Sequence, residues 1–252
     1  MVQPPWVSRT GKAGDNAHVN ELLWLLMLVV NFGAILVVYR IFGKVGLYIW
    51  IPIAAITANI QVLKTVEIFG LTATLGNIVY ATSFLVTDIL SENYGKRDAQ
   101  RAVAFGFFAL VGFVTLMNLA LLFRPATSDF AQPHLSAVFS LLPRVTAASL
   151  VAYAVSQLHD VWAYHFWRKR FPAVRNIWIR NNLSTLVSQA IDSVVFTTGA
   201  FLGVFEFGIV LEIALTTYVL KAIVALLDTP MVYLARRWKD GGAIREDAIT
   251  RE

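Results

Sequence analysis

The sequence contains no cysteine and little charge. Without cysteine the chain has no disulfides, thiolate metal ligands or cysteine nucleophile. Charged residues make up 15% of its 252 residues, whereas soluble domains carry about 25%. Hydrophobic residues make up 57%, and the mean hydropathy is +0.63. A soluble domain of this size could not bury so much apolar surface, which argues against an ordinary cytosolic enzyme as well as against a disordered, collagen-like or disulfide-stapled chain.

Motifs of common enzymes and metal sites are missing as well. None of the three Gly-Lys pairs, which end at Lys12, Lys44 and Lys96, has the sequence of a phosphate-binding loop around it. No His-Glu-x-x-His motif and no glycine-rich dinucleotide loop occur, and the four histidines are scattered. We therefore expect no catalytic residue, no metal and no cofactor.

The chain offers seven apolar segments of about 20 residues or more, the length that spans a bilayer as a helix. They are residues 22–42, 45–63, 68–90, 102–123, 145–167, 181–205 and 207–235. The sequence thus predicts an all-α, polytopic membrane protein, with residues 1–252 forming one transmembrane domain and residues 236–252 a cytoplasmic tail. The shorter apolar stretch Phe130–Leu142 is expected to lie at the membrane interface.

The positions of lysine and arginine indicate the orientation. If the N-terminus is outside and all seven segments cross, 15 of the 21 basic residues lie in cytoplasmic segments. Cytoplasmic loops carry such an excess, so we expect a cytoplasmic C-terminus, an outer N-terminus and a place in the cell (inner or plasma) membrane. The net charge of +5 then reflects topology, and no nucleic-acid partner is expected.

The last three segments carry ionisable residues, which are costly inside a bilayer and by default mark a functional path. Two of them share a Ser-Gln-x-x-Asp motif, at Ser156–Asp160 and at Ser188–Asp192. The i, i+3 spacing places the amide and the carboxylate of each motif on one helical face. Such an edge of donors and acceptors suits a flat heterocycle rich in hydrogen-bonding groups. Because consecutive spans are antiparallel, the repetition of this motif also suggests an inverted repeat.

Each of these charges has a purely structural alternative. Asp192 and Lys221 could neutralise each other, since buried charges are usually paired. Asp160 could pair with Arg168 or Lys169, and Asp228 could cap a kink at the following proline.

Other polar and aromatic residues also leave two interpretations open. Asp88 and Glu92 could pair with nearby basic residues (Lys96, Arg97 and Arg101) or form a gate. Asn59 could bind a neighbouring helix, and aromatic residues on the spans could pack or stack on a ligand.

Several motifs together resemble the queuosine precursor transporter family. They cover roughly residues 45–235 in order: Ala58-Asn59-Ile60-Gln61-Val62, Phe69-Gly70, Thr87-Asp88-Ile89-Leu90-Ser91-Glu92-Asn93-Tyr94-Gly95-Lys96, Leu150-Val151-Ala152-Tyr153, Ser156-Gln157-Leu158-His159-Asp160-Val161, Asn182-Leu183-Ser184-Thr185, Ser188-Gln189, Asp192-Ser193, Tyr218-Val219-Leu220-Lys221 and Asp228-Thr229-Pro230. The resemblance implies that shorter relatives have six helices and that the first apolar segment of this chain is an additional N-terminal helix.

The resemblance implies uptake of a small 7-deazaguanine base, such as 7-cyano-7-deazaguanine, its 7-aminomethyl analogue or a queuine-like base, for queuosine modification of tRNA. Our candidate substrate-binding residues are Asp192, Gln189, Gln157, Asp160, Asn182, Ser184, Asn59, Tyr80, Phe84 and Tyr153. Candidates for charge balance or gating are Lys221, Asp88 and Glu92. The expected partners are the substrate and the lipid bilayer.

Two modes of action fit this sequence. One is a transporter that works alone, and the other is a substrate-binding membrane subunit of an ATP-energised uptake system. A homo-oligomer, the coupling ion and the choice of precursor stay open. An intramembrane enzyme lacks a catalytic motif, and a purely structural protein does not explain five ionisable groups in three spans.

Overall fold

The computed structural model describes residues 13–69, 71–139, 143–203 and 206–244. Within these ranges the protein is all-α apart from one small hairpin, which confirms the predicted fold class. The elements are α1 (Ala13–Gln61), β1 (Thr65–Ile68), β2 (Leu71–Thr74), α2 (Gly76–Asn93), α3 (Lys96–Ala120), α4 (Gln132–Phe139), α5 (Pro143–Arg170), the 3₁₀ turn η1 (Val174–Asn176), α6 (Ile177–Phe201) and α7 (Phe207–Asp240).

Helix α1 is broken into two arms at Gly43. This glycine has φ 56° and ψ −138°, a conformation that side-chain-bearing residues rarely adopt. A Cβ at Gly46 would lie 2.4 Å from the carbonyl oxygen of Val38, so the second arm turns back close to the first. The break falls between the predicted segments 22–42 and 45–63, which form the two arms.

Contacts between helix ends define the two ends of the bundle. The side-chain amide of Asn20 donates to the carbonyl of Glu67 in the hairpin (3.1 Å), and we call this the hairpin end. The guanidinium of Arg168 donates to the carbonyl of Ser91 (2.6 Å) at the opposite end. We call that the basic end, because it also holds Arg236 and other lysines and arginines.

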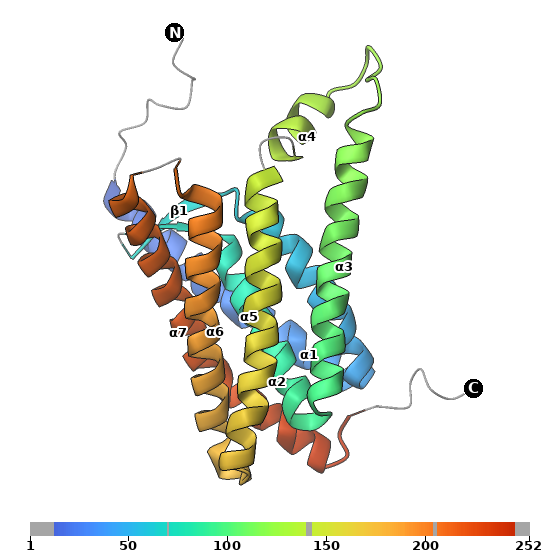
Figure 1. Ribbon diagram of the computed structural model, residues 1–252, viewed down its shortest axis with the longest axis vertical. Coiled ribbons are helices and arrows are strands. Elements are labelled where there is room, and N and C mark those ends of the chain that lie inside the picture. Colours follow the sequence, from blue (N-terminus) through green and yellow to red (C-terminus); the bar gives the residue numbers. More distant parts are fainter. Residues whose placement is uncertain (1–12, 70, 140–142, 204–205, 245–252) are drawn as a thin grey trace, which may run out of the picture.

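With the arms of α1 counted separately, seven helical segments run alternately between the two ends, and the short α4 lies at the hairpin end (Figure 1). The chain enters at the hairpin end and α7 finishes at the basic end. This alternation is what seven membrane crossings require. Which end faces the cytoplasm stays a prediction.

The segment 68–90 was predicted wrongly at its start. Residues 65–74 form an antiparallel hairpin, with Thr65 opposite Thr74 and Ile68 opposite Leu71, and the helix begins only at Gly76. Phe69 turns the chain with a φ of 53°. β-Branched residues favour strands, so the threonines and valine of this stretch, followed by Phe69-Gly70, carried a signal that overall apolarity concealed.

Helix α2 forms the centre of the bundle. All of its residues from Gly76 to Glu92 are buried, and it packs against α1, α7, α3 and α5. A helix enclosed by protein on all sides meets little lipid and can carry polar groups. This explains how α2 accommodates Asp88 and Glu92 together with several serines and threonines.

The outer surface of the bundle is apolar. Leu22 and Val29 on α1, Leu116 on α3 and Leu215 on α7 are each more than half exposed, as expected of side chains that face lipid. Among the described residues, three helical stretches are long and apolar enough to cross a membrane, namely Val19–Gln61, Lys96–Ala120 and Val210–Asp240, and the bent pair α4 and α5 makes a fourth if it is counted as one span. Helices α2 and α6 are not among these stretches, because they carry more polar residues. Those polar residues are buried in the interior of the bundle.

The expected boundaries of the last elements need two corrections. A short helix, α4, lies within the stretch 130–142, but its position at the membrane interface stays a prediction and residues 140–142 lie outside the described ranges. The predicted tail 236–252 begins as a continuation of α7 through Asp240, where Arg236 and Lys239 contact backbone carbonyls of Glu92 and Asn93. Residues 245–252 lie outside the described ranges.

Candidate functional site

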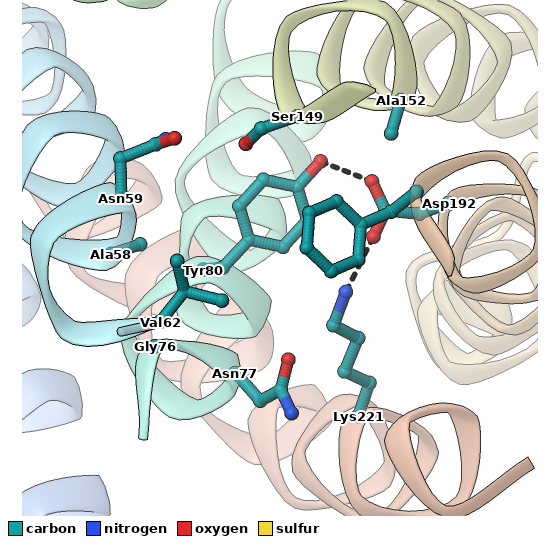
Figure 2. Close-up of a pocket in the computed structure, with 11 residues that line it drawn as sticks. Ala58, Asn59, Val62, Gly76, Asn77, Tyr80, Ser149, Ala152, Asp192 and Lys221 are labelled. Carbon is teal, nitrogen blue, oxygen red and sulfur yellow. Dashed lines mark hydrogen bonds and ion pairs between the residues drawn. The ribbon is translucent and has the colours of Figure 1, made fainter. Parts of the chain in front are cut away.

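A pocket lies among α1, α2, α5, α6 and α7, in the half of the bundle nearer the hairpin end (Figure 2). Its volume is about 30 Å³, which leaves room for about two water molecules. In this conformation it is therefore too small for a bicyclic base. Its lining residues are Ala58, Asn59, Val62, Gly76, Asn77, Tyr80, Ser149, Ala152, Asp192, Phe196 and Lys221.

An ion pair between Asp192 and Lys221 forms one wall of this pocket. The ammonium group of Lys221 on α7 contacts Oδ2 of Asp192 on α6, and both side chains are almost fully buried. The structural alternative, in which these two charges pair with each other, is thus observed. Because the pair lines a pocket, its two charged groups also lie next to the space that a ligand would enter.

Two hydroxyl groups hold the other oxygen of Asp192. Tyr80 of α2 donates to Oδ1 over 2.5 Å, and Ser156 of α5 donates to the same atom over 3.1 Å. The Lys221 nitrogen lies 4.6 Å from the centre of the Tyr80 ring, in range of a cation–π contact. The carboxylate is thus fixed by three helices.

Helical spacing explains why these residues share one pocket. Asn77 and Tyr80 are three residues apart on α2, and Asp192 and Phe196 are four apart on α6, so each pair lies on one helical face. The amide nitrogen of Asn77 is buried without a hydrogen-bond partner. Figure 2 shows the Asn77 amide on the same side of the pocket as Lys221.

The two aromatic candidates beside Tyr80 do not line the pocket. The rings of Phe84 and Tyr153 meet the Tyr80 ring edge-on, with centroids 5.8 and 6.2 Å away. Tyr153 donates its hydroxyl to the carbonyl of Val103 on α3 (3.2 Å). Both rings therefore pack against Tyr80 without lining the pocket.

Four other candidates lie apart from the pocket. Gln157 bonds to Ser83 and Thr87 of α2, and Asn182 donates to Trp178 and Thr229. Ser184 donates to the backbone of its own helix, as a buried serine often does. Gln189 is fully buried, and neither polar atom of its amide has a hydrogen-bond partner.

The two Ser-Gln-x-x-Asp motifs meet across the antiparallel pair α5 and α6. Ser156 of the first motif bonds to Asp192 of the second. In return, the Ser188 hydroxyl of the second motif lies near Asp160 of the first and bonds to Nδ1 of His159 (2.9 Å). The serine of each motif thus lies close to the aspartate of the other motif.

Asp160 does not pair with Arg168 or Lys169 as the structural alternative expected. It lies against Asp88 of α2, and Asp228 of α7 is close to both. Thr185 donates to Asp88 (3.1 Å) and Asn181 to Asp228 (2.9 Å). We call Asp88, Asp160 and Asp228 the carboxyl cluster. Asp228 was expected to cap the kink at Pro230. In the structure its carboxylate accepts a hydrogen bond from Asn181 and so links α7 to α6.

Glu92 anchors an ionic network at the basic end. Its carboxylate lies 2.6 Å from Arg180 of α6 and 3.8 Å from Arg236 of α7. Tyr164 of α5 also donates to it (2.9 Å). One interpretation of the sequence paired Glu92 with Lys96, Arg97 or Arg101. The structure pairs it with Arg180 and Arg236 instead.

Sequence reasoning missed Asn77, Ser149 and Phe196 in the pocket. Asn77 and Phe196 share helical faces with Tyr80 and Asp192, so spacing alone could have found them. Ser149 lies seven residues before Ser156 on α5, so it shares a helical face with that serine and the same spacing could have found it.

Comparison with known proteins gives two informative matches. The chain is 44% identical over 218 residues to the "Probable queuosine precursor transporter" of Bacillus subtilis (strain 168), covering 86% of this chain and 95% of that protein. It is 27% identical over 176 residues to the "Queuosine precursor transporter" of Escherichia coli (strain K12), covering 68% of this chain and 76% of that protein. No solved structure matches the fold.

A family profile described as "Putative vitamin uptake transporter" matches residues 74–235, from the end of the hairpin through most of α7. This range contains the ion pair, the carboxyl cluster and the Glu92 network. Seven alternating helical segments with an apolar outer surface are the architecture of a multi-pass membrane protein. The chain therefore belongs to the vitamin uptake transporter family.

Proposed function

We propose that this protein carries 7-deazaguanine precursors of queuosine across the cell membrane, and that the pocket beside Asp192 binds them. The observation that carries the proposal is the buried Asp192–Lys221 pair in the wall of a pocket. The names of the two relatives, one of which is 44% identical along almost its whole length, support the choice of substrate class.

The chemistry of the pocket matches a guanine-like edge. Such an edge presents an N1–H and a 2-amino group, two donors that one carboxylate such as Asp192 can accept together. The neighbouring carbonyl needs a donor, which Lys221 or the unpartnered amide nitrogen of Asn77 supplies. The rings of Tyr80 and Phe196 offer faces for a planar base. A base with the adenine pattern would leave these buried groups unpaired, so we expect it to be rejected.

Transport requires the closed pocket to widen. On binding, the substrate exchanges places with one partner of Asp192, and the ion pair re-forms when the substrate leaves. The network around Glu92 closes the bundle at the basic end, which we assign to the cytoplasmic side because of its lysines and arginines. Alternate opening of the two ends would then move the base inward.

Uptake of a labelled 7-deazaguanine by cells that cannot make it tests this function. We expect Asp192→Asn to abolish uptake at normal expression, because an amide cannot replace a carboxylate that accepts two donors. The matched control is Glu212→Gln, an exposed acid on α7, which should transport normally. Undiminished uptake by Asp192→Asn would refute the assignment of the site.

The same assay separates the two modes of action. Uptake in a host that supplies no related energising genes supports a transporter that works alone. Uptake that appears only with an added ATP-hydrolysing partner supports a substrate-binding subunit.

A further inference from the structure

The carboxyl cluster is a second polar centre, distinct from the pocket. Asp88, Asp160 and Asp228 come from three different helices, and each is 0% exposed. Asp88 bonds to Thr185 and Asp228 bonds to Asn181, two residues one turn apart on α6, which places these acids side by side. Thr185, which bonds to Asp88, is seven residues from Asp192 along α6, so the cluster lies about 10 Å from the pocket towards the basic end.

The other buried acids of the bundle are neutralised by cations. Asp192 has Lys221, and Glu92 has Arg180 and Arg236. Within the described ranges, no lysine, arginine or histidine nitrogen lies within 4 Å of a carboxyl oxygen of the cluster. A buried carboxylate without a counter-charge costs so much free energy that it takes up a proton instead.

The unpaired atoms of the cluster show what it lacks. Asp88 Oδ1, both oxygens of Asp160 and Asp228 Oδ2 have no hydrogen-bond partner. Asn181 is fully buried and donates its amide nitrogen into the cluster, and its own Oδ1 is unpaired as well. All five atoms are acceptors. The missing component is therefore a hydrogen-bond donor, which a proton on a carboxyl group supplies.

The groups around the cluster do not provide this positive charge. On α5, His159 is engaged with Ser188, and Tyr164 donates to Glu92. On α6, Arg180 pairs with Glu92, and on α7, Lys221 pairs with Asp192. Three neutral hydroxyl groups complete the surroundings, from Ser184, Thr185 and Ser188.

We propose that the carboxyl cluster is a proton-binding site, in which Asp88 and Asp160 share a proton, and that its loading and release accompany substrate transport. A sodium ion would bring one charge to three carboxyl groups, so protons would still be required. The site lies between the pocket and the basic end. Opening the Glu92 network would expose it to water and let the protons leave. The coupling rests on the proposed function, whereas the binding of protons does not.

Infrared spectroscopy of the purified full-length protein tests proton binding without any substrate. The C=O stretch of protonated carboxyl groups, identified by its shift in D2O, should be present at neutral pH and weaken in Asp160→Asn and in Asp88→Asn. Glu212→Gln, which changes an exposed acid on α7, should leave the signal unchanged. Absence of the signal from the wild-type protein at neutral pH would overturn the proposal, even if neither variant folds.

Proteoliposomes test the coupling. An inward proton gradient should drive wild-type accumulation of a labelled 7-deazaguanine severalfold above equilibrium. Asp160→Asn, which mimics the protonated group, should only equilibrate the substrate. Accumulation that ignores the proton gradient or follows a sodium gradient would overturn the coupling. A wild-type protein with the infrared signal that carries no 7-deazaguanine would refute the proposed substrate and still support the proton site.

Discussion

The hydroxyl of Tyr80 lies 2.5 Å from Oδ1 of Asp192, although 112 residues separate them in the chain. This contact joins the central helix α2 to α6 at the pocket. Ser156 shares the same oxygen, and Lys221 holds the other. Asp192 is therefore positioned before any ligand arrives, and a substrate needs to displace only one of these partners.

Tyr80→Phe should weaken transport without unfolding the protein. It removes a hydrogen bond to a charged group, typically about 1.5–3 kcal/mol, and keeps the ring packing. We expect affinity for the labelled base to fall roughly tenfold, measured as the concentration for half-maximal uptake. Tyr218→Phe, on the partly buried face of α7, is the control. Equal affinities in Tyr80→Phe and wild type would contradict a role for the hydroxyl.

Removing one partner of the Asp192–Lys221 pair should be worse for folding than removing both. A lone buried charge costs about 3–5 kcal/mol, whereas neutral replacement of both is often tolerated. Asp192→Asn and Lys221→Gln should each lower the melting temperature in detergent, and the double variant should recover most of it. Uptake should remain absent in all three. A double variant that transports normally would reduce the pair to a structural role.

Gly106 on α3 keeps space for the tyrosine that supports the pocket. A Cβ at this position would lie 2.2 Å from the Tyr153 hydroxyl and 2.7 Å from Ile51. Gly106→Ala should therefore push Tyr153 against Tyr80 and reduce uptake, and adding Tyr153→Phe should restore part of it. Gly112→Ala on the same helix has nothing within 4 Å and should be neutral. Equal uptake by Gly106→Ala and Gly112→Ala would count against this coupling of α3 to the pocket.

Glu92→Gln should loosen the basic end, because it leaves Arg180 buried without its carboxylate. The cysteine-free sequence allows a direct measurement on a Ser184→Cys background, since Ser184 is fully buried on α6. A membrane-permeant maleimide should label this thiol severalfold faster once Glu92→Gln is added. A Val174→Cys background, at an exposed site, should label quickly with and without Glu92→Gln. An unchanged rate at position 184 would argue that the network is not a gate.

The sequence predicts the all-α fold because the length of an apolar segment is a local property of the chain, whereas the orientation expected from its basic residues stays a prediction. The Asp192–Lys221 pair was one of two interpretations that the sequence left open, and the structure shows the pair. The partners of Glu92 and Asp160 were not predictable in this way. They come from helices far along the chain, and their choice depends on how α2 is enclosed. The hairpin at 65–74 was missed because its apolar residues extend the hydropathy of the following helix.

The enclosure of α2 also bears on how the protein is made. A segment that carries Asp88 and Glu92 enters a bilayer less readily as an isolated helix. An acidic residue costs up to about 2.5–3.5 kcal/mol on insertion scales, the full cost applying at the helix centre. Its neutral partners and its counter-charges lie on α5, α6 and α7, which are synthesised after it. We therefore expect α2 to be stable in the membrane only once the later helices have surrounded it.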